Sequence, residues 1–119
     1  MIKGSALIKS FQYALRGLRY AWVHEQNFRI QIGVGCLVIG GALLMGISWA
    51  EWAILTLAIS TTYILELVNT VIEHIMDALS PRIDPYASHV KDIMASAVLL
   101  ASLAAVIIGL TIILPRIMP

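Results

Sequence analysis

Three long stretches without charged side chains limit what this 119-residue chain can fold into. Residues 30–50 and 93–114 contain no charge, and residues 52–65 are also uncharged and mostly apolar. A helix of about 20 apolar residues is long enough to cross the hydrocarbon core of a bilayer. With 60% hydrophobic and 13% charged residues, the chain carries more apolar surface than one small soluble core can bury. We therefore expect an integral membrane protein.

Composition also excludes several classes of function. The formal net charge of +1 gives no basis for nucleic-acid binding. Cys36 is the only cysteine, so neither a disulfide framework nor a zinc-type cysteine spacing is expected. The first 29 residues mix basic and apolar positions without the apolar core of a signal peptide.

Helical periodicity predicts an all-α membrane fold in which residues 1–119 form a single domain. Residues 4–24 place apolar and basic side chains on different faces, as expected of an amphipathic helix lying in the headgroup layer. Transmembrane helices are expected at 30–50, 52–79 and 91–114, and the second is long enough to extend into the cytoplasm. We interpret Pro81 and Pro85 as breaking the chain into a polar loop after the second helix, and Pro115 as closing the third.

The distribution of basic residues predicts the orientation of the chain. Five of them precede the first span, two lie between the second and third, and the loop between the first two spans carries only Glu51. These seven basic residues are Lys3, Lys9, Arg16, Arg19, Arg29, Arg82 and Lys91. Because positive loops stay in the cytoplasm, the N-terminus is expected to be cytoplasmic.

Polar side chains share one face of the second predicted helix. Glu66, Asn69, Glu73 and Asp77 are spaced so that all four fall within an arc of roughly 80°. Carboxylates inside membrane spans are costly, which makes a functional role the first hypothesis. By depth, Glu66 would lie inside the cytoplasmic leaflet and Glu73 near its water boundary.

Glu25 comes just before the first span, and Lys91 and Asp92 open the third, so these residues reach the same cytoplasmic interface. A carboxylate just below the surface could accept a proton from a lipid alcohol. Mg²⁺ prefers a few carboxylates together with phosphate oxygens, and Glu25 and Glu73 could supply the carboxylates. Lys91 could neutralise charge on the phosphates.

Other interpretations stay open at this stage. Asn69 could join membrane helices by hydrogen bonding, Glu73 and Asp77 could be solvated, and Lys91 with Asp92 could simply start a helix. A small proton-coupled transporter would also use a buried carboxylate such as Glu66, but it needs a path open to both faces. A structural subunit of a larger complex is the third hypothesis.

Residues 66–77 resemble the signature of the prokaryotic diacylglycerol kinase family, which includes undecaprenol kinases. Lys91 and Asp92, followed by the small residues of 95–99, resemble the second motif of that family. A third set of residues resembles the N-terminal region of the family: Phe11, Ala14, Gly17, Glu25, Asn27, Phe28 and Arg29.

The resemblance implies an ATP-dependent lipid kinase of the bacterial inner membrane that uses Mg²⁺. It also implies a homotrimer whose active sites are shared between subunits. By position, Glu66 would be the general base, with Asn69 beside it, and Glu25 and Glu73 would hold the metal ion.

The resemblance assigns further residues to the two substrates. Lys91 and Asp92 would contact ATP, Tyr13 and Asp77 would lie near the nucleotide, and Arg29 would line the lipid side. One departure is Asp84, which stands where the family often has a histidine.

The lipid substrate is less constrained than the reaction. Residues 27–30, together with Asp84 and Pro85, are more similar to undecaprenol kinases of Gram-positive bacteria. Undecaprenol is therefore the expected substrate and diacylglycerol the alternative; both present a primary alcohol.

Overall fold

The computed structural model describes residues 4–80 and 84–118, and within them it contains four α-helices. They are α1 (Gly4–His24), α2 (Gln26–Met45), α3 (Trp49–Leu79) and α4 (Pro85–Ile117). Helices α2, α3 and α4 are each long and apolar enough to cross a membrane. The prediction of an all-α fold with three possible spans is confirmed for the described residues.

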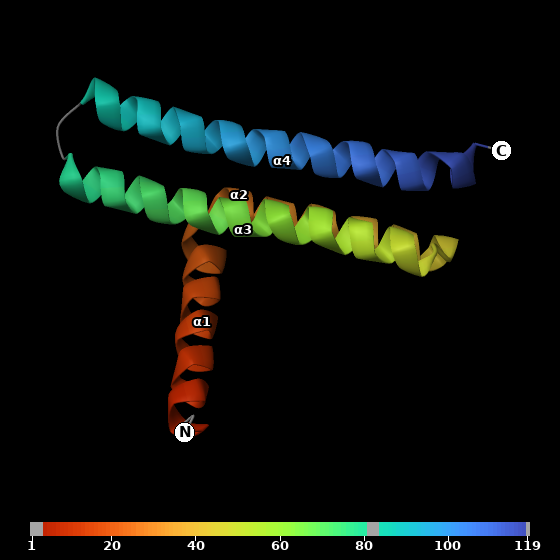
Figure 1. Cartoon of the computed structure of the whole chain (residues 1–119), viewed down its shortest axis with the longest axis horizontal. Coiled ribbons are helices and arrows are strands. Elements are labelled where there is room, and N and C mark those ends of the chain that lie inside the picture. Colours follow the sequence, from red (N-terminus) through yellow and green to blue (C-terminus); the bar gives the residue numbers. More distant parts are fainter. Residues whose placement is uncertain (1–3, 81–83, 119) are drawn as a thin grey trace.

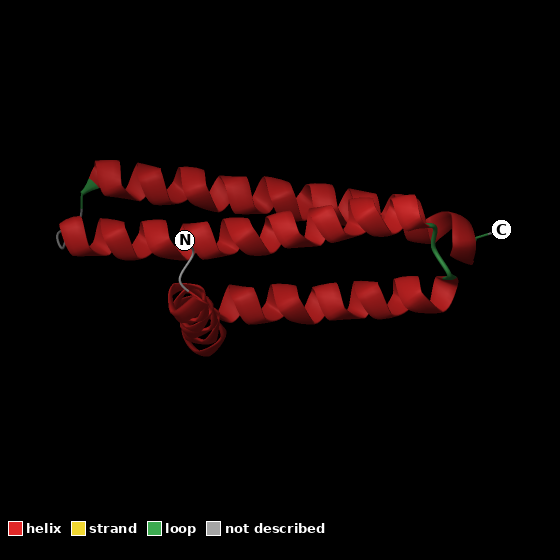
Figure 2. Ribbon diagram, turned by 60° about the horizontal axis from the view of Figure 1, so that its bottom comes forward, coloured by secondary structure: helices red, strands yellow, loops and turns green. Residues whose placement is uncertain are grey.

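Helices α3 and α4 lie side by side along the long axis, and α1 extends away from them across that direction (Figure 1). In the second view α3 lies between α2 and α4, and α2 runs alongside it (Figure 2). Large apolar side chains point outward from all three long helices; Leu37, Leu57 and Leu100 are more than half exposed. Such surfaces suit contact with lipid.

The first long helix has other ends than the expected span of 30–50, and the turn after it falls inside that span. Helix α2 begins at Gln26 and ends at Met45, where Gly46 adopts the left-handed conformation (φ 62°) that glycine accepts without a steric cost. Ser48 then caps α3, which starts at Trp49, three residues before the expected position 52. The turn escaped prediction because its residues carry no charge.

The start of α4 corrects the interpretation of Pro85. This proline lies in the first turn of the helix, where its missing N–H costs nothing, rather than in a loop. Asp84 is the N-cap, and its Oδ1 accepts a hydrogen bond from the backbone N–H of Tyr86 at 2.9 Å. Helix α4 therefore begins six residues before Lys91, while Pro81 and Arg82 lie outside the described residues.

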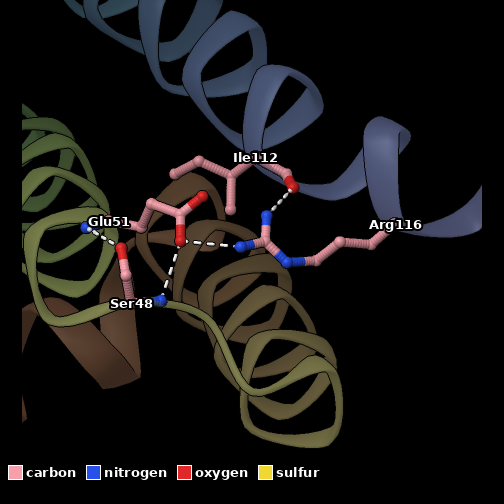
Figure 3. Close-up of polar contacts among 4 residues, drawn as sticks. All are labelled: Ser48, Glu51, Ile112 and Arg116. Carbon is pink, nitrogen blue, oxygen red and sulfur yellow. Dashed lines mark hydrogen bonds and ion pairs between the residues drawn. The ribbon is translucent and has the colours of Figure 1, made fainter.

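Pro115 does not end α4 either. It lies within the last turn, and the helix continues to Ile117. Nearby, a cluster of polar contacts joins this end of α4 to the start of α3 (Figure 3). Arg116 donates one hydrogen bond to the Glu51 carboxylate at 2.7 Å and another to the carbonyl oxygen of Ile112. Glu51 also accepts from the backbone N–H of Ser48 at 2.7 Å, completing a capping box.

Beneath this cluster, a small apolar core holds the three long helices together. It consists of Ala42, Ile47, Leu55 and Ile112. Its members come from α2, from the turn after it, from α3 and from α4. The core fixes the helices at the end that is opposite the predicted site.

Candidate active site

Glu66 is the most deeply placed carboxylate of the predicted site. It lies on α3 with only 3% of its surface exposed. Its Oε2 accepts a hydrogen bond of 2.9 Å from Nε2 of Gln31, which belongs to α2. A buried carboxylate needs such a donor, because a charge without hydrogen bonds inside a protein is costly. The Glu66 side chain is thus held between two helices.

One turn further along α3, Asn69 and Glu73 form a second polar pair. Nδ2 of Asn69 donates to Oε1 of Glu73 at 3.0 Å. Asn69 is buried, and its Oδ1 has no hydrogen-bond partner in the described structure. A buried acceptor without a donor costs about 1–3 kcal/mol, and a ligand that binds this oxygen would recover that cost.

Glu25 joins these residues from the junction between α1 and α2, where it is the half-buried N-cap residue of α2. Glu25 and Glu73 both lie close enough to Glu66 for their charges to interact with its carboxylate. Glu25 and Glu73 are thus each within electrostatic range of Glu66 in a single chain. No group of three or more His, Cys, Asp or Glu side chains close enough to hold a metal ion is found in the described residues.

The oxygen donors nevertheless fit Mg²⁺ in kind. Mg²⁺ usually takes one or two carboxylates and completes its shell with phosphate and water oxygens. The candidate ligands are all hard oxygen donors. Glu25 supplies one from the junction of α1 and α2, and Glu73 and the unpartnered Oδ1 of Asn69 supply the others from α3.

Lys91 and Asp77 form an ion pair between the first turns of α4 and the last turns of α3. The Lys91 side chain is 35% exposed, so its ammonium group is accessible from solvent. Asp92 follows it and is exposed. The pair places a cation near the connection between α3 and α4.

Two expected residues have other contacts in this chain. Tyr13 lies exposed on α1, with the Arg16 guanidinium 5.5 Å from its ring centre. Arg29 donates to the carbonyl oxygens of Trp22 and Val23 at 2.9 and 3.0 Å. These carbonyls are in the last turn of α1, where helices leave acceptors unpaired. Arg29 therefore caps α1.

Two contacts at the site were not predicted. Gln31 pairs with Glu66, and the Tyr20 hydroxyl lies 3.2 Å from Nε2 of His74, which joins α1 to α3. A sequence signal existed for Gln31, because it is the only amide side chain in the uncharged run of 30–50, and amides in membrane helices tend to bond to a neighbouring helix. No comparable signal marked Tyr20 and His74.

An apolar cavity of about 330 Å³ lies beside Gln31 between α2, α3 and α4. Val34, Val38, Ile59, Val106 and Leu110 are among its lining residues. Gln31, Thr62 and Tyr63 supply polar groups near Glu66. A hydrocarbon chain that enters from the bilayer would meet a matching surface there.

Comparison with known proteins identifies the family. The model of the prokaryotic diacylglycerol kinase family matches residues 12–113. The chain is 38% identical to the undecaprenol kinase of Bacillus subtilis (strain 168), over 91% of this chain and 88% of that protein. It is 40% identical to a diacylglycerol kinase of a Synechocystis strain, over 92% of this chain but only 63% of that longer protein. A diacylglycerol kinase of Escherichia coli (strain K12) is 31% identical over 85% of this chain and 83% of its own length. The chain therefore belongs to the prokaryotic diacylglycerol kinase family and is a lipid kinase.

Proposed function

We propose that this lipid kinase transfers the γ-phosphate of ATP to the hydroxyl group of undecaprenol, with diacylglycerol as the alternative acceptor. The observation that carries the proposal is the buried Glu66 carboxylate, which is held by Gln31 beside an apolar cavity. The similarity to an undecaprenol kinase over most of both chains supports the choice of lipid. The diacylglycerol kinases among the relatives keep the alternative in place.

Glu66 is proposed as the general base. It accepts the proton of the lipid hydroxyl while the alcohol oxygen forms a bond to the γ-phosphorus and the bond from that phosphorus to the bridging oxygen of ADP breaks. The products are a lipid phosphate, ADP and one proton, which Glu66 later releases. Asn69 lies one turn away and fixes the neighbouring Glu73 by its hydrogen bond.

Glu25 and Glu73 are proposed to hold Mg²⁺, with the Oδ1 of Asn69 available nearby. The ion would neutralise charge on the phosphates. Lys91 and Asp92 would contact ATP, with Tyr13 and Asp77 near the nucleotide. When ATP binds, Lys91 would leave Asp77 and bind phosphate oxygens instead. Both partners carry negative charge, so the ammonium group keeps a charge-assisted hydrogen bond in either state.

The lipid side is proposed to include Arg29, whose guanidinium holds the end of α1 close to Glu25. Residues 1–119 would form one membrane domain, with α1 as an amphipathic helix on the surface and the N-terminus in the cytoplasm. In the bacterial inner membrane, three chains would assemble into a homotrimer with shared active sites. Tyr13 is exposed on α1, and a site shared between subunits would let it reach a nucleotide held by a neighbouring chain.

The test is a phosphorylation assay on purified protein in detergent–lipid micelles. Undecaprenol and diacylglycerol are compared side by side as acceptors of label from ATP. We expect a higher kcat/KM for undecaprenol, and the reverse order would assign diacylglycerol instead.

The matched variant is Glu66→Gln, which can still accept a hydrogen bond from Gln31 but cannot act as a base at neutral pH. Loss of a general base lowers kcat by about 100-fold to 10,000-fold. Wild-type turnover by Glu66→Gln would remove Glu66 from that role. Proton flux into vesicles without ATP would instead support a transporter.

A further inference from the structure

We propose that Gln31 is a positioning residue that holds Glu66 in both of its protonation states, by donating to the carboxylate and accepting from the carboxylic acid. This inference rests on the proposed role of Glu66 as the base. It concerns α2, which supplies none of the family-motif residues that are expected to touch ATP.

The first observation is the state of the Gln31 amide. Its Nε2 donates to Oε2 of Glu66, whereas its Oε1 is buried and has no partner in the described structure. An unpaired buried oxygen is costly, and rotating the amide would not help, because it would place two acceptors against each other. The charged Glu66 therefore dictates the present orientation of the amide.

The second observation is that the backbone of Gln31 is fixed while its side chain has free space beside it. The Tyr63 hydroxyl donates to the carbonyl oxygen of Gln31 at 3.2 Å, and the Tyr63 ring packs edge-on against Phe28. The side chain borders the 330 Å³ cavity. Rotation of the terminal amide is a soft torsion, so it needs little rearrangement.

These two observations give the unpaired oxygen a purpose. When Glu66 takes the proton of the alcohol, it becomes an O–H donor and no longer needs the N–H of Gln31. A half-turn of the amide then brings Oε1 to the new donor. The carboxyl group thus keeps a hydrogen-bond partner before and after transfer, and its position relative to the alcohol is maintained.

Gln31 forms the direct hydrogen bond to Glu66, and the amide of Asn27, which is exposed in the first turn of α2, is a second donor close enough to influence the carboxylate. The charged groups that interact with Glu66 are Glu25, which precedes α2, and Glu73 on α3, and both carry the same sign as Glu66. Neither can donate to a carboxylate when it is ionised.

The test compares three variants of the full-length protein, with undecaprenol and diacylglycerol each assayed as acceptor. Gln31→Met has a similar length and no hydrogen-bonding groups. We expect its kcat to fall about 10-fold to 100-fold, the size of one hydrogen bond to a charged group, with the KM for ATP unchanged. Its unfolding midpoint should fall modestly, because the buried Glu66 loses its hydrogen-bond donor, so both kcat values are measured under conditions in which the two proteins are fully folded.

Gln31→His introduces a ring nitrogen that can donate or accept a hydrogen bond, depending on the tautomer, and the neighbouring cavity has room for the ring. We expect this variant to recover most of the kcat that Gln31→Met loses. Gln26→Met is the control, since Gln26 is exposed at the start of the same helix. A kcat for Gln31→Met within about two-fold of the wild type would overturn the proposal. So would a histidine variant as slow as the methionine variant. In either case an active wild type and an inactive Glu66→Gln variant would leave the kinase assignment intact.

Discussion

The close approach of α2 to α3 leads to a prediction at Gly35, which is buried where the two helices meet. A Cβ atom at this position would collide with the Tyr63 hydroxyl and lie 3.0 Å from Cζ of the same ring. Gly35→Ala therefore has to displace Tyr63, whose hydroxyl donates to the carbonyl oxygen of Gln31.

The magnitude follows from three opposing effects. Overpacking a close contact costs about 1–3 kcal/mol. Loss of the tyrosine hydrogen bond adds about 1 kcal/mol. Replacing glycine by alanine inside a helix returns about 1 kcal/mol. We expect a net loss of about 1–3 kcal/mol in the free energy of unfolding.

The assay is reversible unfolding in mixed micelles, in which rising amounts of a denaturing detergent are followed by helical circular dichroism. Gly33→Ala and Gly40→Ala are matched controls on α2, because nothing lies within 4 Å of a Cβ atom at either position. Both should be neutral or slightly stabilising.

A double-mutant cycle with Tyr63→Phe isolates the contact, since it removes the hydroxyl that collides. In that background Gly35→Ala should cost about 1 kcal/mol less than in the wild type. The reasoning is refuted if Gly35→Ala is as stable as Gly33→Ala, or if its cost is the same in both backgrounds.

Three further predictions concern the ends of the helices and the nucleotide side. Lys91→Met should raise the KM for ATP at least ten-fold while the KM for the lipid stays unchanged; equal changes in both would argue against a phosphate contact. Asp84→Ala should lower the unfolding free energy by about 1 kcal/mol through loss of the N-cap of α4, whereas Asp84→Ser should retain it. Glu51→Gln and Arg116→Gln should each lower the melting temperature, and the double variant should be little worse than either single one, because both break the same ion pair. Strictly additive losses would contradict that pairing.

The fold was predictable from the sequence to the extent that apolar runs mark helices. Residues 26–45, 49–79 and 85–117 are helical in the structure, close to the expected spans. The ends were less predictable because they depend on caps rather than on hydropathy. Gly46 and Ser48 turn the chain within an uncharged run, and Asp84 with Pro85 starts a helix in residues that resemble a loop.

The acidic face was predictable for a related reason. Glu66, Asn69 and Glu73 lie on one helix, so their helical spacing alone brings them together. The partner of Glu66 was not predictable in the same way, because Gln31 is 35 residues away and the contact depends on how α2 packs against α3. The cap that Arg29 provides for α1 likewise depends on the direction in which α1 leaves α2.

Helix α2 contacts its neighbours near both of its ends and, through the buried Gly35, between them, and these contacts determine how it can affect catalysis. Near one end it joins the apolar core through Ala42, and near the other it bonds to Glu66 and Tyr63 through Gln31, with an apolar cavity between the two levels. A helix held at several points can rotate or shift only if some of these contacts yield. Substitutions along α2 that touch neither ATP nor lipid should therefore change turnover when they move Gln31. They should leave turnover unchanged when they disturb only the lipid-facing side of the helix.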